Sequence, residues 1–111
     1  MRSKINDDAR IGLMLESINN IEAFMSGTNT SEEFQGDKLL CHAVCYNLQC
    51  IGESVYRLSR EFIAEHADTD WEAIEGLRHV LVHDYYNVNL DMVWNIVRDD
   101  LPALKATLSL L

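Results

Sequence analysis

Apolar residues recur at three- and four-residue spacing through most of this chain, and no stretch shows the two-residue alternation of a strand. Such spacing puts apolar side chains on one face of an α-helix. The first segment is predicted to begin at Asn6 or Asp7 and to end near Gly27. Its apolar face consists of Ile11, Met14, Leu15, Ile18, Ile21 and Met25. The pattern predicts an all-α fold, an antiparallel bundle of four to five helices.

A long helix is predicted for residues 37–66. A capping box of Thr30 and Glu33 opens a short turn before it, Gly36 ends that turn, and Asp37 caps the long helix. The apolar positions of this helix are Leu40, Val44, Leu48, Ile51, Val55, Leu58 and Phe62. At 1.5 Å per residue it would be about 45 Å long. We therefore expect it to be the spine of the bundle.

Gly52 lies inside this predicted spine. A glycine in a helix interior costs about 1 kcal/mol relative to alanine. The close approach of another helix would explain it. Glu53, the next residue, is interpreted first as a solvated charge, and alternatively as a spine carboxylate near the Arg/His cluster described below.

Two further helices are predicted in the second half of the chain. Thr69 and Glu72 form a capping box before a helix whose apolar face is Trp71, Ile74, Leu77, Leu81 and Val82. Asn89 is expected to cap the last segment. That segment carries one apolar stripe of Val93, Val97, Leu101, Leu104, Leu108 and Leu111. Because the stripe continues across Pro102, we predict one helix kinked there. Trp71 and Trp94 should be at least partly buried.

Length and charge limit the classes of function. A chain of 111 residues is expected to form a single domain, residues 1–111. Its net charge of −9 argues against indiscriminate binding of nucleic acid or anionic membranes through a basic face. A small local Arg/His site and a basic protein partner both stay compatible with it. With no signal peptide and no apolar stretch of membrane-spanning length, a cytoplasmic protein is expected.

The three cysteines, Cys41, Cys45 and Cys50, lie within ten residues at helical spacing. An odd count at this spacing argues against a disulfide framework and suits a reduced compartment. Cys41, His42 and Cys45 could also be metal ligands. Without a second cluster, buried thiols are the preferred interpretation.

Residues 78–86 (RHVLVHDYY) hold one arginine, two histidines, an aspartate and two tyrosines. Arginine binds the paired oxygens of a phosphate, and histidine transfers protons near neutral pH. A solvated helix end would explain any one of these side chains but explains the whole set less well. The stretch is therefore the candidate site, and it points to phosphate chemistry.

Arg78 and His83 are five residues apart, which on a helix is about 140° around the axis and roughly 7.5 Å along it. One helix would therefore make only a wide, shallow site. A two-fold dimer that brings two such helices face to face would close it. His83 falls near a helix C-terminus, where the dipole favours the protonated form and suits a general acid.

A metal site is the alternative interpretation of the same helix. His79 and His83 are four residues apart, and Glu75 lies one turn earlier on the same face. Two or three ligands on one helix need further ligands from elsewhere, and the sequence offers no clear one. We therefore predict no metal, and an exposed polar role for His79.

The spacing of Arg78, His83 and Tyr85, with four residues and then one residue between them, resembles the motif of the HEPN superfamily. The stretch is most similar to the HepT-type toxins, the nuclease half of HepT–MntA toxin–antitoxin pairs. The resemblance extends over roughly residues 8–111. It includes landmarks in residues 47–53, 57–59, 71–78 and 93–105.

The resemblance implies a homodimeric α-helical ribonuclease that needs no metal or cofactor. Arg78 and His83 would be the catalytic pair. Tyr85 would be the residue that the partner antitoxin, an MntA-like minimal nucleotidyltransferase, modifies with AMP. The residue after the arginine is usually asparagine in this branch, and here it is His79. His79, Asp84 and Glu53 are candidates for supporting roles.

The implied mechanism is attack of the RNA 2′-OH on the adjacent phosphate. His83 would move the proton, and Arg78 would stabilise the charge that builds on the phosphoryl oxygens. AMP on Tyr85 would compete with RNA for Arg78. The acidic surface favours exposed loops or tRNA ends over bulk RNA binding, with tRNA or mRNA as the substrate class. The rival interpretation is a non-catalytic helical module that binds a nucleotide or a protein.

Overall fold

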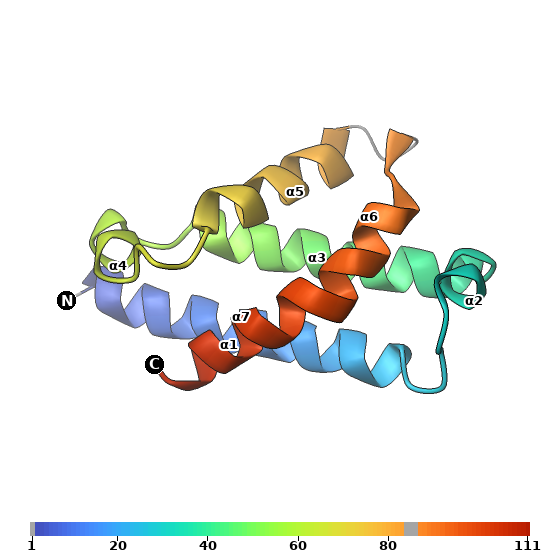
Figure 1. Ribbon diagram of the computed structural model, residues 1–111. Helices are drawn as coiled ribbons and strands as arrows, with labels where there is room; N and C mark the ends of the chain where they lie inside the picture. The colour runs from blue at the N-terminus through green and yellow to red at the C-terminus, as the bar shows by residue number, and fades with distance from the viewer. Residues whose placement is uncertain (1, 84–86) are drawn as a thin grey trace.

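The computed structural model describes the backbone of residues 2–83 and 87–111, and within these ranges the side chains of residues 7–76, 78, 79, 81 and 87–111. These residues form helices joined by short turns, with no strand among them (Figure 1). The elements are α1 (Arg2–Phe24), α2 (Ser31–Gln35), α3 (Lys38–Tyr56), α4 (Arg60–Glu65), α5 (Trp71–His83), α6 (Leu90–Asn95), the π-helical turn η2 (Ile96–Asp100) and α7 (Leu101–Ser109). The all-α prediction is confirmed.

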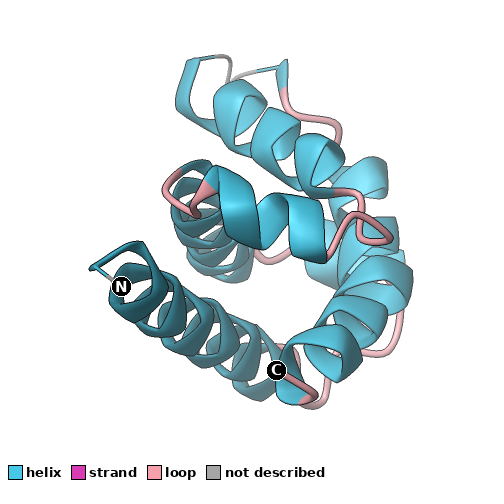
Figure 2. Cartoon of the chain, turned by 90° about the vertical axis from the view of Figure 1, so that its left-hand side faces the viewer, coloured by secondary structure: helices cyan, strands magenta, loops and turns pink. Residues whose placement is uncertain are grey.

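Helix α3 lies in the middle of the bundle, with α1 antiparallel on one side and α5 antiparallel on the other (Figure 1). Seen along the helices, α6 and α7 run across the open side of this layer (Figure 2). The largest fully buried side chains are Phe34, Met14, Ile18, Ile21, Leu48, Ile51, Leu108, Val44 and Val93. In the part of the chain that the structure describes, no helix combines the length and the apolar character needed to cross a membrane.

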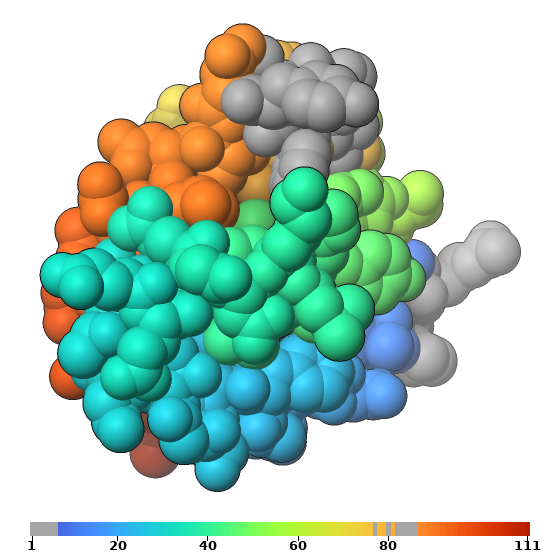
Figure 3. Space-filling view, turned by 90° about the vertical axis from the view of Figure 1, so that its right-hand side faces the viewer, coloured from blue at the N-terminus to red at the C-terminus, as the bar shows by residue number. Residues whose placement is uncertain are grey.

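Helix α2 joins the start of α3 to α6 at one end of the molecule. Figure 3 shows these three segments packed together on that face. The Phe34 and Trp94 rings lie 6.0 Å apart between centroids, and Gln35 Nε2 donates to Asp91 Oδ1 at 2.7 Å. This contact holds the start of the C-terminal helices against the core.

Three predicted caps are confirmed. Thr30 Oγ1 accepts from the Glu33 N–H at 3.1 Å, and Asp37 Oδ1 accepts from the N–H of the third residue after it at 3.0 Å. Asn89 caps α6 in the same way. Gly27, beyond the end of α1, has φ 88°, a conformation that glycine adopts without a Cβ penalty.

The predicted start of the first helix was wrong. Helix α1 already includes Arg2, and Asp7 serves a different purpose. Its carboxylate is buried and accepts from the backbone N–H of Ser59 at 2.8 Å and from the Ser59 hydroxyl at 2.6 Å. Asp7 is therefore a tertiary contact between α1 and the chain before α4.

The single helix predicted for residues 37–66 was also wrong. Helix α3 ends at Tyr56, and α4 begins at Arg60. Ser59 between them has an extended backbone, and its hydroxyl accepts from the Phe62 N–H at 3.1 Å as the cap of α4. Because Asp7 holds Ser59 in this conformation, the chain turns here although the apolar spacing continues.

The cap of α5 is Asp70 and not the predicted pair of Thr69 and Glu72. Asp70 Oδ1 accepts from the N–H of the residue three positions later at 3.1 Å. Trp71 follows at once, is 5% exposed and donates its indole N–H to the His66 carbonyl at 2.9 Å. Trp94 packs against the core, so both tryptophans are at least partly buried, as predicted.

The C-terminal segment is one continuous helical run from α6 through η2 to α7, which confirms that the helix continues across Pro102, while the kink there stays a prediction. Proline has no N–H, and its ring clashes with the carbonyl four residues earlier, here that of Arg98. The chain widens by one residue over Ile96–Asp100, so the Leu101 N–H reaches the Ile96 carbonyl instead. The wider turn keeps Leu101, Leu104 and Leu108 on the core face.

Candidate functional site

Arg78 lies where α5 packs tightly against α3. The facing residue is Gly52, which is buried. A Cβ atom at Gly52 would overlap the Cβ of Arg78 and lie 3.2 Å from its Cα and from the Ile74 carbonyl oxygen. Only glycine allows this approach without a shift of α5. The predicted reason for a glycine inside α3 is therefore confirmed, and the contact sets the position of the Arg78 backbone.

Glu53 holds the guanidinium of Arg78. The Arg78 Nε lies 2.6 Å from Glu53 Oε2, and the Arg57 Nε lies 2.9 Å from Glu53 Oε1. The Arg57 contact is an aligned hydrogen bond, whereas the Arg78 contact is an ion pair without that alignment. The structure thus supports the alternative interpretation of Glu53, a spine carboxylate beside the cluster.

The two arginines change the titration of Glu53. The hydrogen bond from Arg57 lowers the pKa of the Glu53 carboxyl, and the charge of Arg78 lowers it further. Partial desolvation opposes this shift but does not cancel it. Glu53 is therefore ionised at neutral pH and keeps both guanidinium groups in place.

Tyr56 completes the described part of the site. The Arg78 Cζ lies 5.1 Å from the centroid of its ring, within the range of a cation–π contact. Tyr56 is 59% exposed, and the Arg78 side chain is 27% exposed. Sequence reasoning gave neither Tyr56 nor Arg57 a role. Their spacing of three and four residues from Glu53 on α3 was the signal that could have found them.

The remaining predicted site residues follow Arg78 on α5 or come after it. His79 is an exposed residue of α5, and His83 is its last residue. The His83 side chain lies outside the described part, as do Asp84, Tyr85 and Tyr86 entirely. The structure therefore brings Arg78 and Glu53 together. The geometry between Arg78 and His83, and the roles of Asp84 and Tyr85, stay predictions.

Among the described side chains, no three or more His, Cys, Asp or Glu residues gather closely enough to hold a metal ion. The hypothesis built on Glu75, His79 and His83 is not tested by this, because it needs the His83 side chain. Cys41 and Cys45 are buried, as the preferred interpretation has it. Burial raises the pKa of the Cys45 thiol to about 11.

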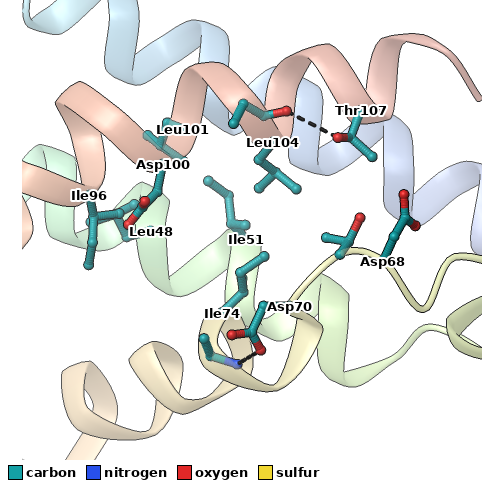
Figure 4. Close-up of a pocket in the computed structure, with 13 residues that line it drawn as sticks. Leu48, Ile51, Asp68, Asp70, Ile74, Ile96, Asp100, Leu101, Leu104 and Thr107 are labelled. Carbon is teal, nitrogen blue, oxygen red and sulfur yellow. Dashed lines mark hydrogen bonds between the residues drawn. The ribbon is translucent and has the colours of Figure 1, made fainter.

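A separate cavity of about 410 Å³ lies between α3, α5 and α7 (Figure 4). Apolar side chains, among them Ile51, Ile74 and Leu104, line it together with the carboxylates of Asp68, Asp70 and Asp100. Those three carboxylates repel phosphate. None of Arg78, Glu53 and Tyr56 lines this cavity, so it is separate from the Arg78 site.

Comparison with known proteins adds to this geometry. The model of a family described as ribonuclease HepT-like matches residues 14–111. A candidate RNase of Methanocaldococcus jannaschii is 30% identical over 92 residues, which cover 83% of this chain and 84% of that protein. A candidate RNase of Caldanaerobacter subterraneus subsp. tengcongensis is 35% identical over 74 residues, 67% of this chain and 66% of its own length. No solved structure matches the chain.

A third relative bears the family's name. A protein of Thermococcus cleftensis, described as a candidate ribonuclease HepT, is 32% identical over 74 residues, which cover 67% of each chain. The family match includes all of α3 and α5, the two helices that carry Glu53 and Arg78. The similarity therefore covers the whole described site.

Proposed function

This chain belongs to the HepT-like ribonuclease family, and from that premise we propose that it cleaves RNA with Arg78 and His83. The observation that carries the proposal is the placement of Arg78. Its backbone is fixed at the Gly52 contact, and its Nε is engaged by Glu53. Four further N–H donors remain on the two terminal nitrogens of a guanidinium, in the geometry that suits two phosphate oxygens.

The reaction is an internal transfer within the RNA. The 2′-oxygen attacks the adjacent phosphorus, the bond from phosphorus to the 5′-oxygen breaks, and a 2′,3′-cyclic phosphate and a 5′-OH end result. His83 takes the proton from the 2′-OH or gives one to the leaving oxygen. Arg78 stabilises the negative charge that grows on the phosphoryl oxygens. Because the nucleophile belongs to the substrate, the scheme has no step that requires a metal.

The active form in this proposal is a homodimer. On one α5 helix the two catalytic residues are separated by about 140° around the axis. A second copy related by a two-fold axis would place two Arg78–His83 segments in one cleft. Light scattering at micromolar concentration should then report a dimer. A monomer that still cuts RNA would contradict this part of the proposal.

The regulation follows the family resemblance. A cognate MntA-like nucleotidyltransferase would attach AMP to Tyr85, two residues after His83. The added phosphate charge would compete with RNA for Arg78 and neutralise a toxin that acts in the cytoplasm. Mass spectrometry after co-expression should find the added mass on Tyr85. AMP on Tyr86 alone would overturn the assignment.

The experiment that tests the activity compares variants of the full chain, by growth on expression and by cleavage of RNA in vitro. Arg78→Ala and His83→Ala should each lose about 10²- to 10⁴-fold in rate. Arg78→Lys should rescue poorly, because an ammonium cannot make the paired planar contacts. Arg98→Ala is the matched control, since its guanidinium lies 5.1 Å from the Trp94 ring centroid, the same distance as Arg78 from Tyr56.

Chelation separates the proposal from its rivals. EDTA should leave cleavage unchanged. If EDTA abolishes cleavage and zinc restores it, Glu75, His79 and His83 become the site. If the wild-type chain binds RNA or a nucleotide but cuts nothing, the chain is a non-catalytic binding module.

A further inference from the structure

Tyr56 is a surface residue beside the Arg78 guanidinium. Tyr56 is the last residue of α3, and 59% of it is exposed. In a core, a phenol ring would bury as much apolar area as most core side chains do. The one described contact of its ring with a charged group is the Arg78 guanidinium at 5.1 Å. An exposed ring next to the proposed phosphate-binding arginine offers a flat apolar surface beside the candidate site.

The second arginine–aromatic pair of the described chain shows what a purely structural stack looks like. Arg98 lies over Trp94, which is partly buried and packs on Phe34 and on the core. The Trp94 ring thus has neighbours that account for its place. Tyr56 has the same distance to its arginine but projects from the helix end into solvent.

Charge at this spot differs from charge on the chain as a whole. The net charge of the protein is −9, yet Glu53 here lies between Arg57 and Arg78, which leaves one positive charge in excess. Each of the two arginines points its Nε toward the Glu53 carboxylate. Arg57 is 54% exposed on its side chain. A ring beside the Arg78 guanidinium, followed in the chain by the exposed Arg57, matches the base and phosphates of one RNA strand.

We propose that Tyr56 is the stacking platform for one unpaired base of the RNA, next to the phosphate that Arg78 binds, and that Arg57 binds a neighbouring phosphate. The inference rests on the proposed function and deepens it, because it names the substrate as RNA with a base free to leave its stack. Paired bases in a duplex keep both faces covered, so the site selects single-stranded segments.

The test measures binding apart from cleavage. A short, mixed-sequence RNA with 2′-O-methyl groups lacks the attacking hydroxyl, so fluorescence anisotropy reports its dissociation constant with the full-length protein. Tyr56→Leu keeps apolar bulk and removes the ring. Stacking on an aromatic side chain contributes about 1–3 kcal/mol per base, so binding should weaken about 5- to 150-fold. Tyr46→Leu is the matched control, a 65% exposed tyrosine on the same helix.

A set of oligonucleotides that each lack one base locates the stacked position. One missing base should weaken wild-type binding and have no further effect on Tyr56→Leu, which is the signature of a direct pair in a double-mutant cycle. Arg57→Gln should reduce the salt dependence of binding, and Tyr56→Leu should leave it unchanged.

The outcomes separate this inference from the proposed function. If wild-type protein binds the oligonucleotide and Tyr56→Leu weakens it while native RNA is never cut, the platform holds and the ribonuclease assignment fails. If native RNA is cut and Tyr56→Leu binds as tightly as wild type, the platform is wrong. Equal losses for Tyr56→Leu and Tyr46→Leu, or no binding by wild type, also overturn it.

Discussion

Helix α3 has two sides that are built differently. Toward α1 it buries long aliphatic side chains, and Met14, Ile18 and Ile21 of α1 are at most 1% exposed. Toward α5 it presents Gly52 and Glu53, and the partner residue is a half-buried arginine. The first side gains stability from apolar burial. The second uses backbone proximity and one ion pair to fix a cation. The contrast shows that one side of α3 stabilises the fold while the other side positions a candidate site residue.

The largest effect is expected on the α1 side. Ile18→Ala should lower the free energy of unfolding by about 2–5 kcal/mol, because it removes buried methylene groups and leaves a cavity. Leu13→Ala on the same helix is the control, since Leu13 is 47% exposed and surface changes stay within about 0.5 kcal/mol. Urea unfolding measures both. Similar losses for the two variants would contradict the described core.

Gly52→Ala tests the α5 side. The new methyl group would overlap Arg78, so α5 must shift, and such overpacking costs about 1–3 kcal/mol. RNA binding should fall as well, because the Arg78 backbone moves. Gly76→Ala is the control on α5, where nothing lies within 4 Å of an added Cβ. That variant should gain up to about 1 kcal/mol. The idea fails if Gly52→Ala is as stable as Gly76→Ala.

Glu53→Gln should change stability only slightly, since its ion pairs are partly exposed and screened by solvent. The folded-state pKa of Glu53 is lowered, so its contribution is present above the ordinary glutamate pKa and is lost as pH falls through the folded value. Urea unfolding of wild type and Glu53→Gln should therefore converge on acidification. Glu22→Gln removes a 2.7 Å pair with Lys105 far from Arg78 and should leave RNA cleavage intact, unlike Glu53→Gln.

Thiol reactivity gives the smallest and most local comparison. Cys45 on the buried face of α3 has a pKa raised to about 11 by burial, while Cys50 is partly exposed. At pH 8, iodoacetamide should modify Cys50 first and reach Cys45 only after unfolding. The raised Cys45 pKa also means that stability is lost as pH rises from the thiol's ordinary value of 9.0 toward 11. Equal alkylation rates for Cys45 and Cys50 would show that the buried face of α3 becomes accessible to solvent in the folded protein.

Local patterns in the sequence predicted local structure well. The caps at Thr30, Asp37 and Asn89 and the continuous helical run across Pro102 depend on residues within one or two turns. The break before α4 depends on Ser59 meeting Asp7, which is 52 residues away in the chain. No periodicity within one segment carries that information.

The candidate site also combines features that local sequence predicts with features that depend on contacts between distant residues. Arg78 stands out from its neighbours in sequence, and Gly52 suggested a close helix approach. That the two face each other, and that Glu53 then meets the guanidinium, depends on the register between α3 and α5. Sequence reasoning left Glu53 between two interpretations. It missed Tyr56, because only the folded structure shows that this exposed tyrosine lies against Arg78.

The single large contact of α5 also governs how the molecule opens. Among the described helices, α3 is the one against which α5 packs extensively, and the cavity of Figure 4 separates it from α7. An opening that separates α5 from α3 would leave the contacts of α1 with α3 and with α7 in place. The amide hydrogens of α5 would then exchange with solvent through a partial opening that needs less free energy than complete unfolding. Arg78, the proposed phosphate-binding residue, would move with α5 in such an opening.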